Sequence, residues 1–351
     1  MIYSFNNDYS EGAHPQILKA MMETNLDQNA GYSMDCHTEH AKELIRQEIG
    51  RDDADIHMIV GGTQTNLLAI SCALKPYQAV ICAETGHINV HETGAIEATG
   101  HKVLAYPTND GILTPAHIKK ALNWHTDEHM VQPKMVYISN ATEVGTQYTK
   151  AQLEDLSDFC RQNGLYLFLD GARLGSALTS PANDLTMADI ARLTDLFYIG
   201  GTKNGALFGE ALVISNPDLK PDFRFLIKQR GAMLAKGWLL GIQFETLFQN
   251  GLFYEMASHA NEMAEQLKKG LTACGYSFRW NSTTNQLFPI FPNTVMEKLA
   301  KDFLFSSQES IDENHTCIRL VTSWATKPEG VEAFLKALKE YTSSISATAI
   351  I

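Results

Sequence analysis

Residues 165–173, LYLFLDGAR, indicate the class of fold. The first five form one uninterrupted hydrophobic run, which is typical of a strand that is buried on both faces of a parallel sheet. An acid, a glycine and an arginine follow within four residues. Ligands of open parallel sheets bind at the carboxyl ends of the strands, so this stretch also predicts where a site lies.

Strands and helices alternate on both sides of this stretch. We expect further strands over residues 54–60, 79–82, 134–139, 195–199 and 211–214, and helices over residues 65–74 and 149–163. Thr149 is a suitable N-cap for the second helix, and Gly164 is a suitable residue to end it. This alternation favours a doubly wound α/β domain.

The pattern changes near residue 240. One long amphipathic helix is expected over residues 238–274, strands over 285–291 and 316–322, and a last helix from Pro328 to about Tyr341. The chain is therefore expected to have three parts. Residues 1–30 are mostly loop with one helix and pack against a neighbour, residues 31–240 form a large domain, and residues 241–351 form a smaller α+β domain.

The composition excludes several classes of function. Lys and Arg number 28 and Asp and Glu number 40, so the net charge of −12 disfavours nucleic acid and anionic membranes as partners. No apolar stretch reaches the roughly 18 residues of a membrane span. The first ten residues lack a basic region followed by an apolar run, so we expect no signal peptide and a cytoplasmic protein.

The cysteines and histidines predict no metal site. The six cysteines are scattered without a CxxC pair, as expected for reduced thiols in the cytosol. Two patterns come nearest to a ligand set, namely Cys36-His37-x-x-His40 and the pair His87 and His91. Neither is a complete four-ligand pattern, so no metal is expected.

Three motifs at strand ends carry the candidate chemistry: Gly61-Gly62-Thr63 at the start of a helix, Asp170 after the most apolar strand, and Lys203 after a third strand. Each alone has an ordinary explanation, namely a glycine turn, a helix N-cap and a surface lysine. Together, a phosphate cradle, an acid and a lysine fit an enzyme that uses pyridoxal 5'-phosphate. His87 follows another strand, and its imidazole can stack on a flat cofactor ring.

The same segments resemble the threonine aldolase/β-eliminating lyase group of fold-type I pyridoxal-phosphate enzymes, especially its low-specificity or L-allo-threonine aldolases. The matching segments are VGGTQTNL at 60–67, Gly86-His87, LDGARL at 169–174, Thr202-Lys203 and IRLVT at 318–322. The resemblance implies a mostly parallel seven-stranded sheet flanked by helices, with a smaller C-terminal α+β domain. It also implies homodimers that share residues across their active sites, often paired into tetramers.

The resemblance implies a role for each matching residue at the cofactor. Lys203 would carry the Schiff base, and Asp170 would keep the pyridine nitrogen protonated. His87 would stack on the ring, while Gly62 and Thr63 would hold the phosphate.

The resemblance also implies how the substrate is held. Arg173 would lie beside the cofactor 3-oxygen and the substrate carboxylate, and Arg319 would clamp that carboxylate with its two-pronged guanidinium. Asn7 stands where the family has a serine that contacts the substrate. The family's Glu-Asn-Thr-His reads Ser139-Asn140-Ala141-Thr142 here, so the histidine near the substrate hydroxyl is missing.

Two further segments depart from the family pattern. The family's Tyr-Gly-Asp-Asp is altered at residues 32–35, and its Gly-Gly-Met-Arg reads Gly-Ala-Met-Leu at residues 231–234. Arg230 or Lys236 is expected to supply the cation that is lost in the second segment.

We therefore expect a pyridoxal-phosphate-dependent carbon–carbon lyase that cleaves threonine or allo-threonine into glycine and an aldehyde. A base removes the β-hydroxyl proton, and His87, His91 and an ordered water are the candidates. One alternative is β-elimination or transamination of another amino acid. The other is a non-catalytic protein that carries the cofactor.

The segment 223–241, FRFLIKQRGAMLAKGWLLG, bears on assembly because it combines apolar and basic side chains in an acidic protein. In one interpretation its helix closes the core of its own domain. In the other it packs on a second subunit and brings Arg230 or Lys236 to the partner's cofactor phosphate.

Overall fold

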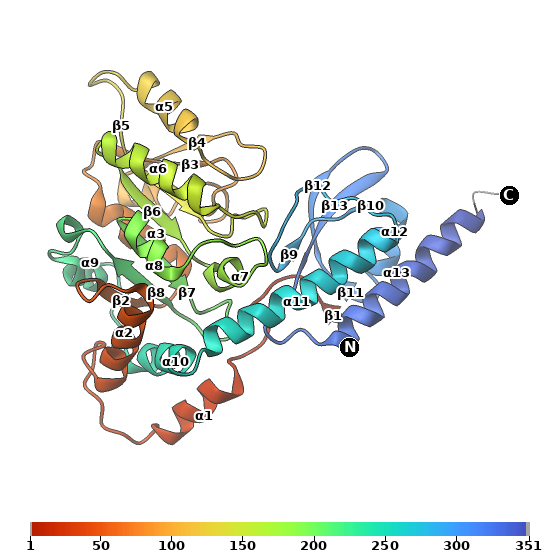
Figure 1. Ribbon diagram of the computed structural model, residues 1–351, viewed down its shortest axis with the longest axis horizontal. Coiled ribbons are helices and arrows are strands. Elements are labelled where there is room, and N and C mark those ends of the chain that lie inside the picture. The colour runs from red at the N-terminus through yellow and green to blue at the C-terminus, as the bar shows by residue number, and fades with distance from the viewer. Residues whose placement is uncertain (1, 349–351) are drawn as a thin grey trace.

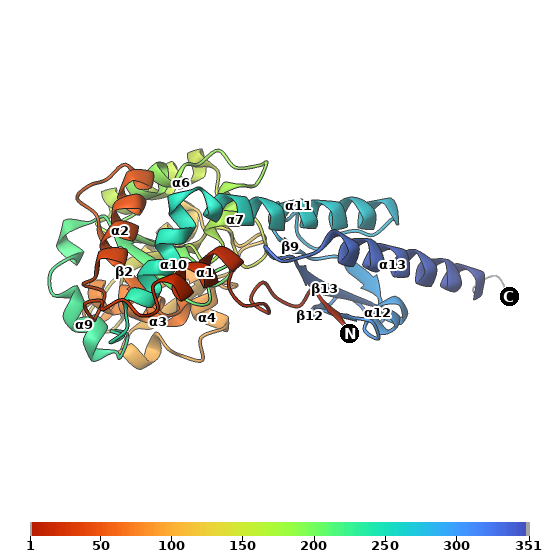
Figure 2. The same ribbon diagram turned by 90° about the horizontal axis from the view of Figure 1, so that it is seen from below.

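The computed structural model describes residues 2–348, which form two domains side by side (Figure 1). The larger domain has a seven-stranded sheet between layers of helices. The smaller domain has a separate antiparallel sheet, and its long helices α11 and α13 lie along one side of that sheet (Figure 2).

The large sheet has the strand order β2-β8-β7-β6-β5-β3-β4. β8 is antiparallel to both of its neighbours, and the other pairs are parallel, so the expected mostly parallel sheet is confirmed. Its strands are β2 (Asp55–Ile59), β3 (Gln78–Ala83), β4 (Lys102–Tyr106), β5 (Gln132–Ser139), β6 (Tyr166–Asp170), β7 (Leu196–Gly200) and β8 (Glu210–Ile214).

Strand β6 lies in the middle of this sheet and is buried on both faces, as its uninterrupted apolar run predicts. Leu167 and Leu169 join one apolar cluster, and Phe168 joins the cluster on the opposite face. The helices around the sheet are α2 (Cys36–Ile49), α3 (Gly62–Ala73), α4 (His87–Val90), α5 (Pro115–Trp124), α6 (Lys150–Gln162), α7 (Leu174–Leu178), α8 (Met187–Leu193), α9 (Phe223–Gln229) and α10 (Trp238–Gln249).

Helix α6 shows why the local sequence forms these elements. The Thr149 side chain accepts the N–H of Gln152, and the Gln152 side chain accepts the N–H of Thr149, which is a capping box. Gly164 then takes a φ of 63°, a conformation that costs glycine little. Both ends of the predicted helix are thus confirmed.

The prediction of one helix over residues 238–274 is wrong. Helix α10 ends at Gln249, and α11 (Leu252–Ala273) begins after Gly251, whose φ of 73° is left-handed and interrupts the helix. Helix α10 packs on α2 in the large domain, whereas α11 contacts α7 at one end and α13 at the other. Apolar side chains of α11 belong to the large-domain core up to Met256 and to the small-domain core from Met263.

The small sheet contains β9 (Gln286–Leu287), β10 (Ile290–Pro292), β12 (Ser306–Ser310) and β13 (His315–Val321), and helix α12 (Asn293–Leu299) follows β10. The strand expected over residues 285–291 is divided in two at Phe288 and Pro289, because proline has no N–H for the ladder. The last helix, α13 (Pro328–Thr348), continues beyond the expected end at Tyr341.

The start of the chain joins the two domains. Strand β1 (Tyr3–Ser4), which was not expected, pairs in parallel with β11 (Phe303–Leu304) of the small domain. The chain then crosses to the large domain, where α1 (Pro15–Glu23) packs on α10. Residues 5–14 therefore run between the domains.

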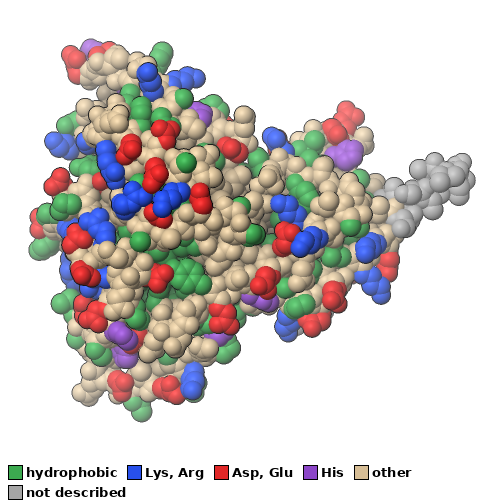
Figure 3. All heavy atoms as spheres, in the orientation of Figure 1, with side chains coloured by type: hydrophobic (Ala, Val, Ile, Leu, Met, Phe, Trp, Pro, Cys, Tyr) green, Lys and Arg blue, Asp and Glu red, His purple; other side chains and the backbone are tan. Residues whose placement is uncertain are grey.

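The surface carries charges of both signs. Acidic and basic side chains are intermixed over the face in Figure 3. Within residues 2–348, no helix combines the length and the apolar content that a membrane span requires.

Candidate active site

Two cavities lie at the carboxyl ends of the central strands. The inner cavity, of about 350 Å³, is lined by all six predicted cofactor residues, which are Gly62, Thr63, His87, Asp170, Arg173 and Lys203. The outer cavity, of about 450 Å³, is lined by Arg319 of the small domain. His87, Arg173 and Lys203 line both, so the two cavities are neighbours in one site.

The inner cavity has a seat for an anion at the start of α3. Gly61 is the N-cap of α3 and has no side chain that could cap the helix. The first backbone N–H groups of α3 are therefore not bonded to a capping side chain. Within residues 2–348, no hydrogen bond engages the backbone N–H of Gly62 or Thr63. A Cβ on Gly62 would lie 3.3 Å from the Tyr198 hydroxyl, so glycine keeps this approach open. These features fit a phosphate group.

Asp170 ends β6 at the floor of the inner cavity and is 4% exposed. Its Oδ2 accepts hydrogen bonds from the Tyr137 hydroxyl at 2.6 Å and from Asn66 Nδ2 at 3.1 Å. Its Oδ1 accepts the N–H of Ala172 at 3.0 Å. Burial, reinforced by Asp170, raises the pKa of Tyr137 and of Tyr198 well above the ordinary value, so both phenols remain donors. The carboxylate is thereby fixed in one orientation.

Lys203 follows β7 and lines both cavities. Burial and the nearby Arg173 lower the pKa of Lys203, which increases the share of neutral, nucleophilic amine. The loop that carries Lys203 is held by Glu210, a buried acid that sequence reasoning missed. Glu210 accepts the N–H of Gly201 at 3.0 Å and the hydroxyl of Thr202 at 2.9 Å.

A second buried acid holds His87. The Nδ1 of His87 lies 2.7 Å from Oε1 of Glu92, and Glu92 is 5% exposed. Asn66 Nδ2 donates to the same oxygen at 2.7 Å and also to Asp170. A chain of hydrogen bonds therefore links His87 to Asp170. Glu92 and Asn66 were not among the predicted residues, and the sequence does not single them out because polar residues lie directly beside both.

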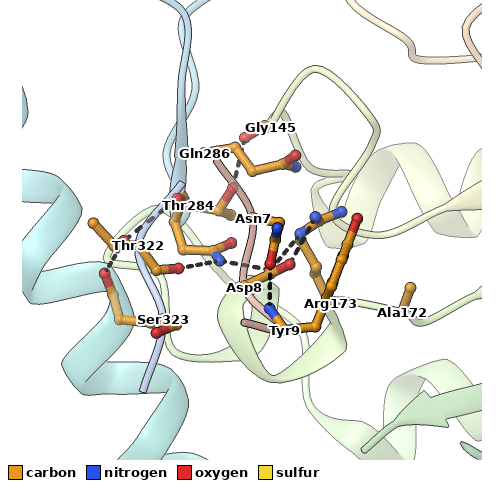
Figure 4. A network of polar contacts seen from close by, with 12 residues as sticks. Asn7, Asp8, Tyr9, Gly145, Ala172, Arg173, Thr284, Gln286, Thr322 and Ser323 are labelled. Carbon is orange, nitrogen blue, oxygen red and sulfur yellow. Dashed lines mark hydrogen bonds and ion pairs between the residues drawn. The ribbon is translucent and has the colours of Figure 1, made fainter. Parts of the chain in front are cut away.

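Arg173 is paired with an acid from the N-terminal segment (Figure 4). Its Nε donates to Oδ2 of Asp8 at 2.7 Å, and its Nη2 donates to Oδ1 at 3.0 Å. Asn285 Nδ2, from the small domain, donates to Oδ2 of Asp8 at 3.0 Å. Burial alone would raise the pKa of Asp8, but Arg173 and Lys203 outweigh it and hold that pKa below its ordinary value. Asp8 thus joins three parts of the chain.

Asn7, the predicted substrate contact, lies beside this pair, but its side chain forms hydrogen bonds within its own loop. Its Oδ1 accepts the N–H of Tyr9 at 2.9 Å (Figure 4). The same oxygen accepts the hydroxyl of Ser10 at 3.0 Å. Asn7 is not among the residues that line either cavity.

Arg319, on β13, faces the outer cavity with an incomplete set of partners. Its Nη2 reaches the carbonyl oxygen of Asn6 at 3.5 Å, and its Nε is buried without a hydrogen-bond partner. Burial and Arg173 lower the pKa of Arg319, so the surrounding protein does not compensate its charge. A partly buried guanidinium whose Nε is buried without an acceptor fits an anionic ligand.

The remaining predicted residues lie elsewhere. Arg230 and Lys236 are exposed and line neither cavity of their own chain. The Nδ1 atoms of His37 and His40 each lie 2.7 Å from the carboxylate of Glu245. Within the described part of the chain, no group of three or more ligand side chains is arranged to hold a metal ion.

Comparison with known sequences identifies the family. The sequence profile of the β-eliminating lyases matches residues 7–292, which is well over half of the chain. The chain belongs to the β-eliminating lyase family. This family membership confirms the expected class of chemistry, a lyase that depends on pyridoxal phosphate.

Two relatives of this β-eliminating lyase family member and one further protein of similar fold are informative. A solved structure of threonine aldolase from Leishmania major is 58% identical, with a TM-score of 0.96 over 97% of this chain and 99% of that one. The low-specificity L-threonine aldolase of Pseudomonas aeruginosa is 31% identical over 347 residues, 95% of this chain and 96% of that one. A single mutant of Thermus thermophilus aspartate aminotransferase is 16% identical, with a TM-score of 0.74 over 97% and 91%. That last likeness concerns the fold alone, and it agrees with the expected fold type I.

Proposed function

We propose that this lyase cleaves threonine or allo-threonine, which are β-hydroxy-α-amino acids, into glycine and an aldehyde. The observation that carries the proposal is the pair of neighbouring cavities. One has the lysine, the acid and the anion seat that a cofactor needs, and the other has an unpaired arginine for a substrate carboxylate. The Leishmania major and Pseudomonas aeruginosa relatives, both named threonine aldolases, support the choice of substrate.

The residues of the inner cavity fit pyridoxal phosphate. The N–H groups of Gly62 and Thr63 would bind its phosphate, and the Lys203 amine would attach to it covalently. Asp170 would hold a proton at the ring nitrogen, and the imidazole of His87 would lie on the ring. When bound, the cofactor supplies a sink for the electron pair that is left when Cα–Cβ breaks.

Arg319 would bind the substrate carboxylate from the outer cavity. Because Asp8 already takes two of the donors of Arg173, the unpaired Nε of Arg319 is the better partner for a second carboxylate. Arg173 would instead limit the space beside the cofactor. In this assignment the substrate carboxylate would contact Arg319 of the small domain. The β-carbon of the substrate would then lie where the two cavities meet.

The test is the product. Purified protein loaded with pyridoxal phosphate is incubated with threonine and, separately, with allo-threonine, and the aldehyde is measured with a coupled alcohol dehydrogenase. Equal amounts of glycine and aldehyde are expected. Ammonia with a keto acid would indicate β-elimination, a keto acid without ammonia would indicate transamination, and a stable cofactor absorbance without turnover would indicate a non-catalytic carrier.

A homodimer, alone or paired into a tetramer, is the assembly that we propose. Support comes from large apolar side chains that are exposed along residues 22–34, namely Met22, Leu26, Tyr32 and Met34. In the segment 223–241, Phe223 is buried in its own domain, which accords with the first interpretation, while Phe225 is 75% exposed. Light scattering would test the assembly.

Active sites that are shared across the dimer make a sharper prediction. If Arg230 or Lys236 binds the partner's cofactor phosphate, Arg230→Glu should weaken cofactor binding and regain activity in hybrids with Lys203→Ala subunits. Properly formed hybrids without activity would return Arg230 to a role in its own chain. We also propose a cytoplasmic location, which is supported by six cysteines that form no disulfide.

A further inference from the structure

The inner and outer cavities share five lining side chains, which we call the junction: Tyr9, His87, Glu143, Arg173 and Lys203. An amino acid whose carboxylate is bound by Arg319, and whose amine takes the place of Lys203 at the cofactor, would pass through the junction. The bonds around its Cα and Cβ would then lie there. Glu143 is the one carboxylate among these five side chains.

Glu143 has one engaged oxygen and one available oxygen. Its Oε1 accepts the hydroxyl of Ser139 at 2.6 Å and the backbone N–H of His87 at 3.0 Å. Within residues 2–348, no other residue donates a hydrogen bond to its Oε2, and that oxygen is not among the buried unpartnered atoms. The side chain is thus fixed through one oxygen, while the other is accessible to a ligand in the cavities.

On this basis, and resting on the proposed function, we propose that Glu143 is the catalytic base that accepts the β-hydroxyl proton of the substrate. The O–H bond breaks and its proton moves to Oε2 of Glu143. The electron pair of that bond forms the second C–O bond of the aldehyde, and the Cα–Cβ pair remains on Cα. Cα then takes up one proton to give glycine, and Glu143 releases one, so protons balance.

The two histidines named by sequence reasoning are less suited to this step. His87 is held at Nδ1 by Glu92, and its ring lines the inner cavity where the flat cofactor would lie. His91 lines the outer cavity alone, and burial together with His87 lowers its pKa, which makes it a weaker proton acceptor. Glu143 lies between the two cavities and is available in both.

The surroundings of Glu143 make it a stronger proton acceptor than an exposed glutamate. Burial, with a contribution from Asp170, raises the pKa of Glu143 above the ordinary value for glutamate. A base is most effective when its pKa lies close to the working pH. The charged and titratable groups around it are the cations Arg173 and Lys203, the acids Asp170 and Glu84, the two histidines, the Cys82 thiol, and the phenols of Tyr9, Tyr137 and Tyr148.

The first test is Glu143→Gln, because glutamine keeps an oxygen that can accept from Ser139 and His87. For the holoenzyme acting on threonine, kcat should fall by about 10²–10⁴-fold, as for loss of a general base, with little change in KM. The cofactor absorbance and the affinity for glycine, which has no β-hydroxyl, should stay as in the wild type. Glu97→Gln is the matched control, since it removes an exposed carboxylate from the segment after His87.

Two further readouts separate a base from a structural role. In Glu143→Ala, added formate should restore part of the activity, because a free carboxylate can occupy the vacated position. In cofactor-free wild-type protein, ¹³C NMR of the Glu143 carboxyl should show protonation at a pH above that of an ordinary glutamate. Normal kcat in Glu143→Gln, or an ordinary titration, would overturn the assignment. If the wild type itself releases no aldehyde, the proposed function fails instead.

Discussion

Asp8→Asn tests whether the N-terminal segment is part of the active-site architecture. The Asp8 carboxylate accepts three donors, two from Arg173 and one from Asn285. Asparagine has one acceptor oxygen, and its NH₂ group would face a donor, so at least one of these bonds is lost. Arg173 would keep its charge without a counter-ion, because Asp8 is the partner of its ion pair.

The expected cost follows from the burial of this pair. The side chain of Asp8 is 1% exposed and that of Arg173 is 12% exposed, so water cannot replace the lost partner. Removal of one member of a buried ion pair costs about 3–5 kcal/mol of unfolding free energy. An exposed pair would cost about 0–1 kcal/mol, so the two cases are well separated.

The pH dependence gives an independent check. The pKa of Asp8 is lower in the folded protein than in the unfolded chain, so the ion pair stabilises the fold above the ordinary aspartate pKa of about 3.9. This contribution is lost as the pH falls through the lower, folded-state pKa. The difference between wild type and Asp8→Asn should therefore be constant near neutrality and should vanish in strong acid.

Urea unfolding, followed by tryptophan fluorescence at several pH values, measures this difference. Arg173→Gln and the double variant complete a thermodynamic cycle, and the exposed Glu11→Gln in the same segment is the control. The cycle should give a large coupling energy, and the control should lie close to wild type. A cost of Asp8→Asn below about 1 kcal/mol at neutral pH would refute the argument from burial.

The other predictions concern the cofactor, the substrate and the backbone around the site. Lys203→Ala should lose both turnover and the visible absorbance of lysine-linked cofactor; a variant that keeps both would remove the lysine from its assigned role. Arg319→Lys should lower kcat/KM for threonine by about 10–100-fold, the worth of a charged hydrogen bond of about 1.5–3 kcal/mol, with cofactor affinity unchanged. An effect on cofactor affinity alone would contradict it. Gly171→Ala should destabilise the fold by about 1–3 kcal/mol, because the new Cβ would lie 1.9 Å from the carbonyl oxygen of Tyr198. Urea unfolding measures this cost, and an unchanged midpoint would contradict it.

Residues 165–173 illustrate how far the sequence predicts the fold. A short run that is hydrophobic on both faces is typical of a strand between two layers of helices, and β6 lies there. Because the carboxyl ends of parallel strands meet, Asp170 and Lys203 could be expected to approach each other from the sequence alone. The break at Gly251 was missed although Asn250-Gly251 is a turn-forming pair, since the apolar spacing continues on both sides of it.

The polar residues that complete the site were harder to predict. Asp8 and Asn285 lie far from Arg173 in the sequence, and only the packing of the two domains brings them within hydrogen-bond distance. Glu92 and Glu143 flank residues that were predicted, yet an acid in a loop has no periodicity that distinguishes it from a solvated one. Tertiary structure alone buries Glu92 and places the partly buried Glu143 between the two cavities.

The hydrogen-bond partners of the polar groups divide the site into a fixed part and a receptive part. Asp170, Asp8 and Arg173 are bonded to neighbouring protein groups, so they set geometry and hold charge in place. The free N–H groups at the start of α3, the Lys203 amine, the Nε of Arg319 and the Oε2 of Glu143 have no such bonds within residues 2–348. The N–H groups are suited to bind a phosphate, and the amine to attack an electrophilic carbon. The Nε is suited to bind a carboxylate, and the Oε2 to accept from a hydroxyl. A phosphorylated aldehyde joined to a β-hydroxy-α-amino acid carries all four, which is why the unsatisfied groups argue for the substrate more strongly than the satisfied ones do.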